Sequence, residues 1–305
     1  MIGQDWAYEA AFARHEGLIS AEEQQRLRRS HVAIVGMGGV GGVHLVTLGR
    51  LGIGRFSIAD LDAFDVANMN RQYGARTDTL GRPKVEVMAE EIRRINPEVE
   101  LRVFDHGIAP ESIADFLSGV DLFVDGIDFF AIDLRRRLFR QAAQNGIYAV
   151  TAGPIGFSTA WLAFDPNGMS FDEYFDLSDD QPELDQLVAF AVGLTPAMTH
   201  TPYMDLSKID VANQRGPSAG LACHLCSGVA AAESLKILLG RGPVRCAPAY
   251  SQFDAYRGLL RRGRLWRGNR HPVQKLRRWA LGRKLRNLPS GKNAAEHGAA
   301  TVAVR

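Results

Sequence analysis

The chain has 305 residues, of which 46% are hydrophobic and 23% are charged. This composition suits a large globular core, and no run of about 18 apolar residues indicates a helix that crosses a bilayer. Three cysteines exclude a disulfide framework, and the N-terminus lacks the apolar stretch of a secretory signal, so we expect a cytoplasmic protein.

The net charge of +2 hides a division of the chain into two parts. Residues 256–305 hold 14 Lys or Arg and one acid, a local charge of +13, which leaves −11 on residues 1–255. We expect residues 264–305 to form a basic C-terminal tail. It either lies back on the acidic body or contacts tRNA phosphates, an anionic membrane surface or an acidic protein.

Residues 1–30 are expected to form an N-terminal helical segment, after which apolar strands alternate with amphipathic helices. Strands are expected near residues 32–36, 56–60, 99–104, 121–125 and 147–151, and helices near 40–51, 81–95, 111–118 and 131–145. This alternation predicts an α/β fold with a doubly wound, mostly parallel, Rossmann-like sheet. Ligands of such sheets bind where the strands end.

After residue 151 the pattern changes. FSTAWLAF alternates like a strand, an acid-rich passage runs from about residue 165 to 218, and a helix is expected over 220–239. From Pro272 a further helix is predicted, with Val273, Leu276, Trp279 and Ala280 near one face.

The first strand runs into a glycine turn formed by Gly36, Gly38, Gly39 and Gly41. Such a turn lets phosphate oxygens reach the N–H groups at a helix start. Asp60 ends the next strand, where a carboxylate accepts hydrogen bonds from both ribose hydroxyls. Arg71 and Lys84 follow and would face a triphosphate, so the implied ligand is ATP.

The order of these pieces resembles the ThiF/MoeB/HesA family, whose members resemble ubiquitin-activating enzymes. The resemblance runs from about Arg14 to Gly263, and it makes residues 31–263 an adenylation domain. The matching pieces are the doubled-glycine turn, Asp60 and Asp62, Asn68, Asn70-Arg71-Gln72, Gly81-x-x-Lys84 and Asp125-x-x-Asp128. The resemblance implies a few antiparallel C-terminal strands and a crossover loop over the active site at about 165–218.

The family also implies roles for single residues. Asp128 would hold magnesium, a hard cation that prefers oxygen ligands. Asp125, by its position after the strand, is expected to be a structural acid that caps the following helix. Phe129 and Phe130 stand where the family commonly has an Asn-containing sequence. Arg14 would reach the triphosphate of a neighbouring subunit, so a homodimer would complete the site.

Cysteine use narrows the chemistry. Many family members bind zinc with two CxxC pairs, whereas here Cys223 and Cys226 form the only pair. Because Cys223 and His224 would point in different directions on a helix, a zinc site is not expected. These thiols are expected to pack at a helix start. Activating enzymes that form a thioester usually carry its cysteine in the crossover, and residues 152–222 contain none. The adenylate would then be the last step on this protein, unless Cys223 or Cys226 is the catalytic thiol.

The resemblance implies an enzyme that uses ATP and magnesium to adenylate the C-terminal carboxylate of a ubiquitin-like or sulfur-carrier protein. Two alternatives stay open. A tRNA-modifying relative would adenylate a carboxylate attached to a base, which suits the basic tail. A non-catalytic nucleotide-binding scaffold or a nicotinamide enzyme would not need Arg71, Lys84 and a magnesium acid together.

Overall fold

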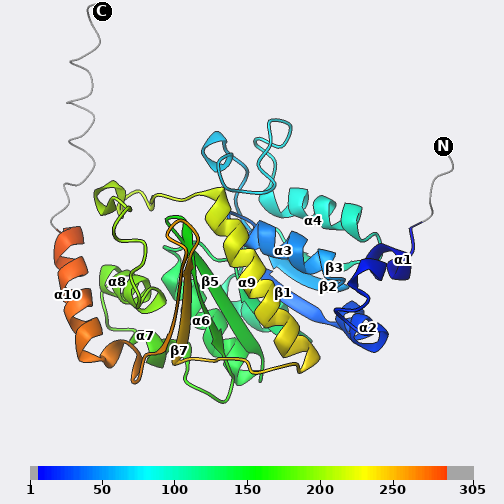
Figure 1. The fold of residues 1–305 in the computed structure, drawn as a ribbon. Coiled ribbons are helices and arrows are strands. Elements are labelled where there is room, and N and C mark those ends of the chain that lie inside the picture. Colours follow the sequence, from blue (N-terminus) through cyan, green and yellow to red (C-terminus); the bar gives the residue numbers. More distant parts are fainter. Residues whose placement is uncertain (1–5, 287–305) are drawn as a thin grey trace, which may run out of the picture.

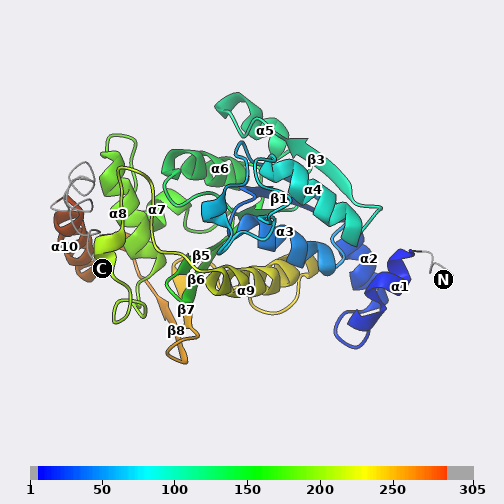
Figure 2. The same ribbon diagram turned by 90° about the horizontal axis from the view of Figure 1, so that it is seen from above.

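The computed structural model describes residues 6–286 as one eight-stranded sheet with helices on both faces (Figure 1 and Figure 2). The strands are β1 His31–Val35, β2 Arg55–Ala59, β3 Glu100–Phe104, β4 Leu122–Asp125, β5 Tyr148–Ile155, β6 Ser158–Phe164, β7 Ala249–Asp254 and β8 Leu259–Arg264. They lie in the order β3-β2-β1-β4-β5-β6-β7-β8. The first five are parallel and the last three antiparallel, which confirms the predicted fold class.

Alternation along β1 explains the two layers of helices. Successive side chains of a strand point to opposite faces, and both faces of β1 are apolar. Val32 and Ile34 join one core cluster, whereas Ala33 and Val35 join the other. The first cluster includes residues of α3 Gly41–Arg50, α4 Lys84–Ile95 and α9 Gly220–Leu239. The second includes residues of α5 Ile113–Phe116, α6 Ile132–Gln144, α7 Phe171–Phe175 and α8 Glu183–Leu194.

Helix α9 is, among residues 6–286, the one helix long and apolar enough by composition to cross a membrane. It crosses the front of the sheet in Figure 1 and packs along β5, β6 and α3. Cys226 and Ala230 are buried in that contact. Packing against the sheet therefore accounts for its apolar composition.

The N-terminal helices cover the edge of the sheet where the parallel strands begin. α2 Ala21–Arg29 starts at Ser20, whose side chain and Glu23 form a reciprocal capping box. In α1 Tyr8–Phe12, the Tyr8 hydroxyl donates to the carbonyl of Gly52, just before β2. This segment lies at the opposite end of the molecule from α10 Pro272–Arg286 in both views.

Two stretches differ from what the sequence predicted. The crossover contains α7 and the buried helix α8, so it is not a simple loop over the site. In the segment predicted as a tail, the 3-10 helix η5 Gly268–Arg270 and α10 pack on α7 and α8. Residues 287–305 of that segment lie outside the described residues.

Helix α10 docks by a face that its hydrophobic pattern does not predict. Gln274 is buried, whereas Val273, Leu276 and Trp279 are about half exposed or more. The Gln274 amide donates to the carbonyl of Val192 in α8. Polar contacts therefore hold this helix, and its predicted apolar face looks outward.

Candidate active site

The glycine turn after β1 is shaped by close contact with the loop after β4. Gly36 has φ +87°, and a side chain there would collide with the carbonyl oxygen of Gly126. A side chain at Gly41 would collide with the carbonyl of Gly36. These two glycines bring the start of α3 against the end of β4, at the carboxyl edge of the parallel strands.

Gly38 and Gly39 line the other side of the turn. An added Cβ at Gly38 would meet the amide of Gln72, 3.5 Å away. One at Gly39 would lie 3.1 Å from the Cys223 sulfur and 3.8 Å from the Arg71 side chain. The turn therefore faces the 66–72 segment and the first turn of α9.

Asp60 ties the end of β2 to this turn. Its carboxylate accepts hydrogen bonds from the backbone N–H groups of Met37, at 2.6 Å, and Asp62, at 2.8 Å. Burial raises the pKa of Asp60 above its ordinary value, although these two donors oppose the rise. Each carboxylate oxygen has further acceptor capacity, so the geometry suits the predicted contact with ribose hydroxyls.

Lys84 begins α4, as predicted, but it has a local partner. Its side chain is 8% exposed, and Nζ donates to the Asp62 carboxylate at 2.9 Å. A cation at a helix start opposes the helix dipole, and the Asp62 carboxylate compensates for this at Lys84. A buried ammonium beside the glycine turn is still placed to meet an anion.

Arg71 lies in a segment that its neighbours fix to α9. Its guanidinium donates to the carbonyl of Ala67 and to the side chain of Asn70. Asn70 in turn donates to the carbonyl of Ser218, just before α9. Asn68 accepts from the N–H of Asp65, the N-cap of the short 3-10 helix η2 Val66–Asn68, so in this structure the two side chains form a capping box.

The two acids after β4 have different surroundings. Asp125 is buried and accepts hydrogen bonds from Arg135 at 2.9 Å and Thr151 at 2.7 Å, so its role is structural. It bonds to a side chain within α6 and does not cap that helix, which starts without a side-chain cap. Asp128 is exposed and accepts one hydrogen bond, from the N–H of Phe130 at 2.9 Å. An exposed carboxylate at this edge suits magnesium, which prefers oxygen ligands.

Phe129 and Phe130 follow Asp128 directly and connect it to the crossover. The Phe129 ring packs on Phe190 of α8, with ring centroids 5.4 Å apart. The Arg135 guanidinium also lies over the Phe190 ring, 4.5 Å from its centroid. The aromatic pair thus anchors α8 beside Asp128.

Arg14 does not join the site of its own chain. It lies exposed in the 3-10 helix η1 Ala13–His15, within the N-terminal segment that packs where the strands begin. The glycine turn, Asp60 and Asp128 lie where the strands end. Within one chain, therefore, Arg14 faces the wrong edge of the sheet.

The cysteines are buried, and their pKa values rise. Burial raises the pKa of the Cys223 thiol to about 11, although Arg71 opposes the rise, and burial also raises the pKa of Cys226. His224 is exposed on the other face of α9. Among residues 6–286, no group of three His, Cys, Asp or Glu lies close enough to hold a metal ion. This geometry does not favour a thiolate nucleophile.

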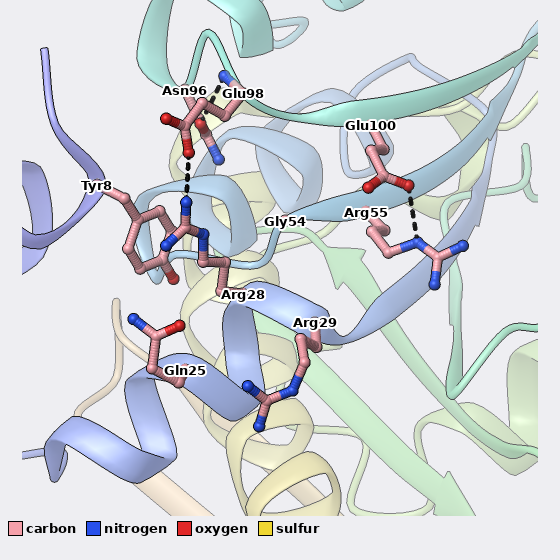
Figure 3. A pocket seen from close by; sticks show the side chains of 9 residues that line it. All are labelled: Tyr8, Gln25, Arg28, Arg29, Gly54, Arg55, Asn96, Glu98 and Glu100. Carbon is pink, nitrogen blue, oxygen red and sulfur yellow. Dashed lines mark hydrogen bonds and ion pairs between the residues drawn. The ribbon is translucent and has the colours of Figure 1, made fainter.

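A groove of about 510 Å³ lies at the opposite edge of the sheet (Figure 3). It adjoins Gly54 and Arg55, where β2 begins. Arg28 pairs with Glu98 at 2.7 Å and Arg55 with Glu100 at 3.1 Å, so two of the arginines that line the groove already face carboxylates. It is separate from the predicted nucleotide site.

The structure thus gathers the glycine turn, Asp60, Asp62, Arg71, Lys84 and the end of β4, and it leaves Arg14 apart. Sequence reasoning missed the positioning roles of Asn70 and Gln72. Gln72 is buried next to Gly38, and its Oε1 has no hydrogen-bond partner among the described residues. Their position next to Arg71 in the sequence was the available signal.

Several known proteins are similar to this chain in sequence. The ThiF family model matches residues 12–273. The tRNA threonylcarbamoyladenosine dehydratase of Haemophilus influenzae is 36% identical over 153 residues, which are 50% of this chain and 58% of that protein. The probable adenylyltransferase/sulfurtransferase MoeZ of Mycobacterium tuberculosis is 26% identical over 239 residues, 76% of this chain and 54% of that protein. The chain spans about half the length of these curated relatives.

Solved structures agree on the fold. PaaA superposes with a TM-score of 0.64 at 18% identity, covering 87% of this chain and 76% of PaaA. E. coli TcdA, a tRNA N6-threonylcarbamoyladenosine dehydratase solved with ATP, superposes at 0.57 and 23% identity, covering 78% of this chain and 98% of TcdA. At these identities the likeness shows the fold alone. The family match spans most of the chain, and the chain belongs to the ThiF family.

Proposed function

We propose that this protein adenylates a carboxylate with ATP. The observation that carries the proposal is the gathering of Asp60, Arg71 and the Lys84–Asp62 pair around the glycine turn, beside Asp128. A carboxylate oxygen attacks the α-phosphorus, the bond to the pyrophosphate oxygen breaks, and an acyl adenylate remains. No protein base is needed, since a carboxylate is already ionised at pH 7.

The residues of the site then act by position and charge. The turn offers backbone N–H groups to phosphate oxygens, and Asp60 accepts from the ribose. Arg71 and Lys84 neutralise charge on the leaving pyrophosphate. Asp128 would hold magnesium, which would supply positive charge to the triphosphate when bound. Asp62 keeps the Lys84 ammonium in place beside the turn.

We further propose that the carboxylate is carried by a tRNA base. Three dehydratase relatives share 36%, 36% and 38% identity with the chain, against 33% for the sulfur carrier protein adenylyltransferase of Thermus thermophilus and 26–27% for MoeZ and the E. coli ThiS adenylyltransferase. The local charge of +13 after residue 255 suits a polyanion. These two observations favour a carboxylate on tRNA over the C-terminal carboxylate of a protein as the substrate.

A carrier-protein substrate is the second candidate. The MoeZ match, though weaker, covers 76% of this chain against 50% for the dehydratase of Haemophilus influenzae. The wider match extends over more of the sequence beyond the nucleotide site. This observation keeps the C-terminal carboxylate of a ubiquitin-like or sulfur-carrier protein as the alternative substrate.

Pyrophosphate exchange into ATP tests both proposals. We expect exchange with magnesium that depends on tRNA carrying the base-linked carboxylate, and ATP binding preferred over NAD by calorimetric titration. The tRNA affinity should fall steeply with salt, because phosphate contacts release counterions. Exchange driven only by a β-grasp carrier protein would move the substrate to the second candidate, and tight NAD binding without an ATP signal would overturn adenylation itself.

We also propose a homodimer in which Arg14 completes the partner's site. The exposed position of Arg14 at the opposite edge makes a role in its own chain geometrically unsuitable. Inactive Arg14→Ala and inactive Asp128→Ala subunits, mixed into one dimer, should then regain partial exchange, because one of the two sites keeps both residues. Mass spectrometry would verify the mixed dimer, and a verified mixed dimer without activity would contradict the shared site.

A further inference from the structure

Three aromatic rings from separate segments meet at the carboxyl edge of the sheet. Phe157 lies in the β5–β6 turn, Tyr203 in the crossover and Tyr256 in the β7–β8 turn. The Phe157 and Tyr203 rings stack at 5.6 Å and 15°, and Tyr256 lies 5.5 and 5.2 Å from them. Phe157 is 39% exposed and Tyr256 69% exposed, so this aromatic platform presents ring surface to solvent.

Hydrogen bonds fix the Tyr203 ring of the platform in its position. The Tyr203 hydroxyl donates to the buried carboxylate of Asp254 at 3.0 Å and accepts from the N–H of Phe157 at 3.2 Å. Gly156 has φ +59°, and an added Cβ would lie 2.7 Å from the Tyr203 ring. The rings are therefore held in place before any ligand arrives.

An arginine-rich edge strand runs from the platform. β8 carries Arg261, Arg262 and Arg264, all exposed, and pairs only with β7 at the rim of the sheet. Within residues 6–286 none of these three forms an ion pair, although Arg270 and Arg278, farther along, both pair with Asp176. Guanidinium groups without carboxylate partners are available to phosphates. Figure 2 shows the β7–β8 hairpin projecting from the body.

The platform lies on the same edge as the proposed nucleotide site. β7 runs parallel to β4 and β5. Asp254 ends β7 and Tyr256 follows it, so both lie at the same edge of the sheet as Asp128, which follows β4. Three strand spacings separate β4 from β7, roughly 14 Å at about 4.8 Å each. A molecule whose carboxylate reacts beside Asp128 can extend across the crossover to these rings.

We propose that the aromatic platform and β8 bind an unpaired RNA segment, with bases stacked on the rings and phosphates on the arginines. This rests on the proposed tRNA substrate. Arg262 and Arg264 lie on one face of β8 and Arg261 on the other. Exposed rings beside such unpaired cations are the combination that single-stranded nucleic acids need. An acidic peptide would use the arginines but not three clustered rings.

Binding of fluorescein-labelled bulk tRNA and a short unstructured oligoribonucleotide, followed by anisotropy, tests the surface. We expect Tyr256→Ala to weaken both about tenfold, as for loss of one stacked base, and Tyr256→Phe to bind like wild type. Arg262→Gln with Arg264→Gln, two arginines on the same face of β8, should lower the slope of log affinity against log salt by about 1.4, at about 0.7 per single-strand contact. The matched control is Arg50→Gln with Arg93→Gln, exposed arginines at the ends of α3 and α4, which should leave the slope unchanged.

The outcomes separate this inference from the proposed function. If wild-type exchange depends on tRNA but all four variants bind RNA equally, the platform is not the RNA surface and the function stands. Should RNA binding depend on Tyr256 without tRNA-dependent exchange, the surface stands and the tRNA substrate falls. Loss of carrier-protein binding with unchanged RNA binding would assign the surface to a protein and overturn the inference. ATP titration and thermal unfolding confirm that each variant is folded.

Discussion

Asp128→Asn is expected to lower pyrophosphate exchange roughly a hundredfold or more while leaving the melting temperature unchanged, as for loss of one preorganised charge contact of about 3 kcal/mol. The side chain is exposed, and its one hydrogen bond, from the N–H of Phe130, can be made equally by an asparagine oxygen. Only the negative charge that would hold magnesium is lost. Arg71→Ala should cause a similar loss, since it removes a cation beside Gly39.

Asp125→Asn is the matched control, three residues away. Asp125 is buried against Arg135, and removing one charge from a buried pair typically costs about 3–5 kcal/mol of folding free energy. This variant should therefore melt early, whereas Asp128→Asn should not. Exchange above a tenth of wild type in Asp128→Asn, with unchanged melting, would give Asp128 a structural role and remove it from the proposed metal site.

The parallel half of the sheet was predictable because its signals are local. β1 and β2 are buried apolar runs, and Gly36 and Asp60 mark their ends in the sequence. The family order then pointed to Asp60, Arg71 and Lys84, which the structure brings together near the glycine turn. What the sequence did not reveal was the Lys84–Asp62 pair, because a contact across 22 residues has no periodic signature.

The second half was less predictable for two physical reasons. The helix α8 reads ELDQLVAFAVGL and is buried nearly all round, so it lacks the amphipathic period that distinguishes a surface helix from a loop. Helix α10 has an apolar face, but it docks through polar groups such as Gln274 and Arg277, each with a carbonyl partner in or next to α8. Hydrophobic periodicity cannot detect a helix held by hydrogen bonds.

These polar contacts change what truncation should do. Deletion of residues 266–305 would remove none of the predicted ATP contacts, because all of them precede residue 129. The structure places Asn269 and Gln274, both buried, in that segment. Deletion of residues 287–305 leaves all described contacts intact, so it is the truncation that should keep ATP binding within a few fold.

Asn269→Ala is expected to destabilise the fold by about 3 kcal/mol, because unsatisfied buried groups cost about 1–3 kcal/mol each. The Asn269 amide donates to the carbonyls of Phe175, at 2.9 Å, and Ala189, at 2.7 Å, which joins α7 and α8 to the start of α10. Alanine leaves both carbonyls without this donor. Urea denaturation would measure the change, with Lys275→Ala, an exposed position on α10, as the control that stays near wild type. An Asn269→Ala protein as stable as wild type would show that α10 is a removable appendage after all.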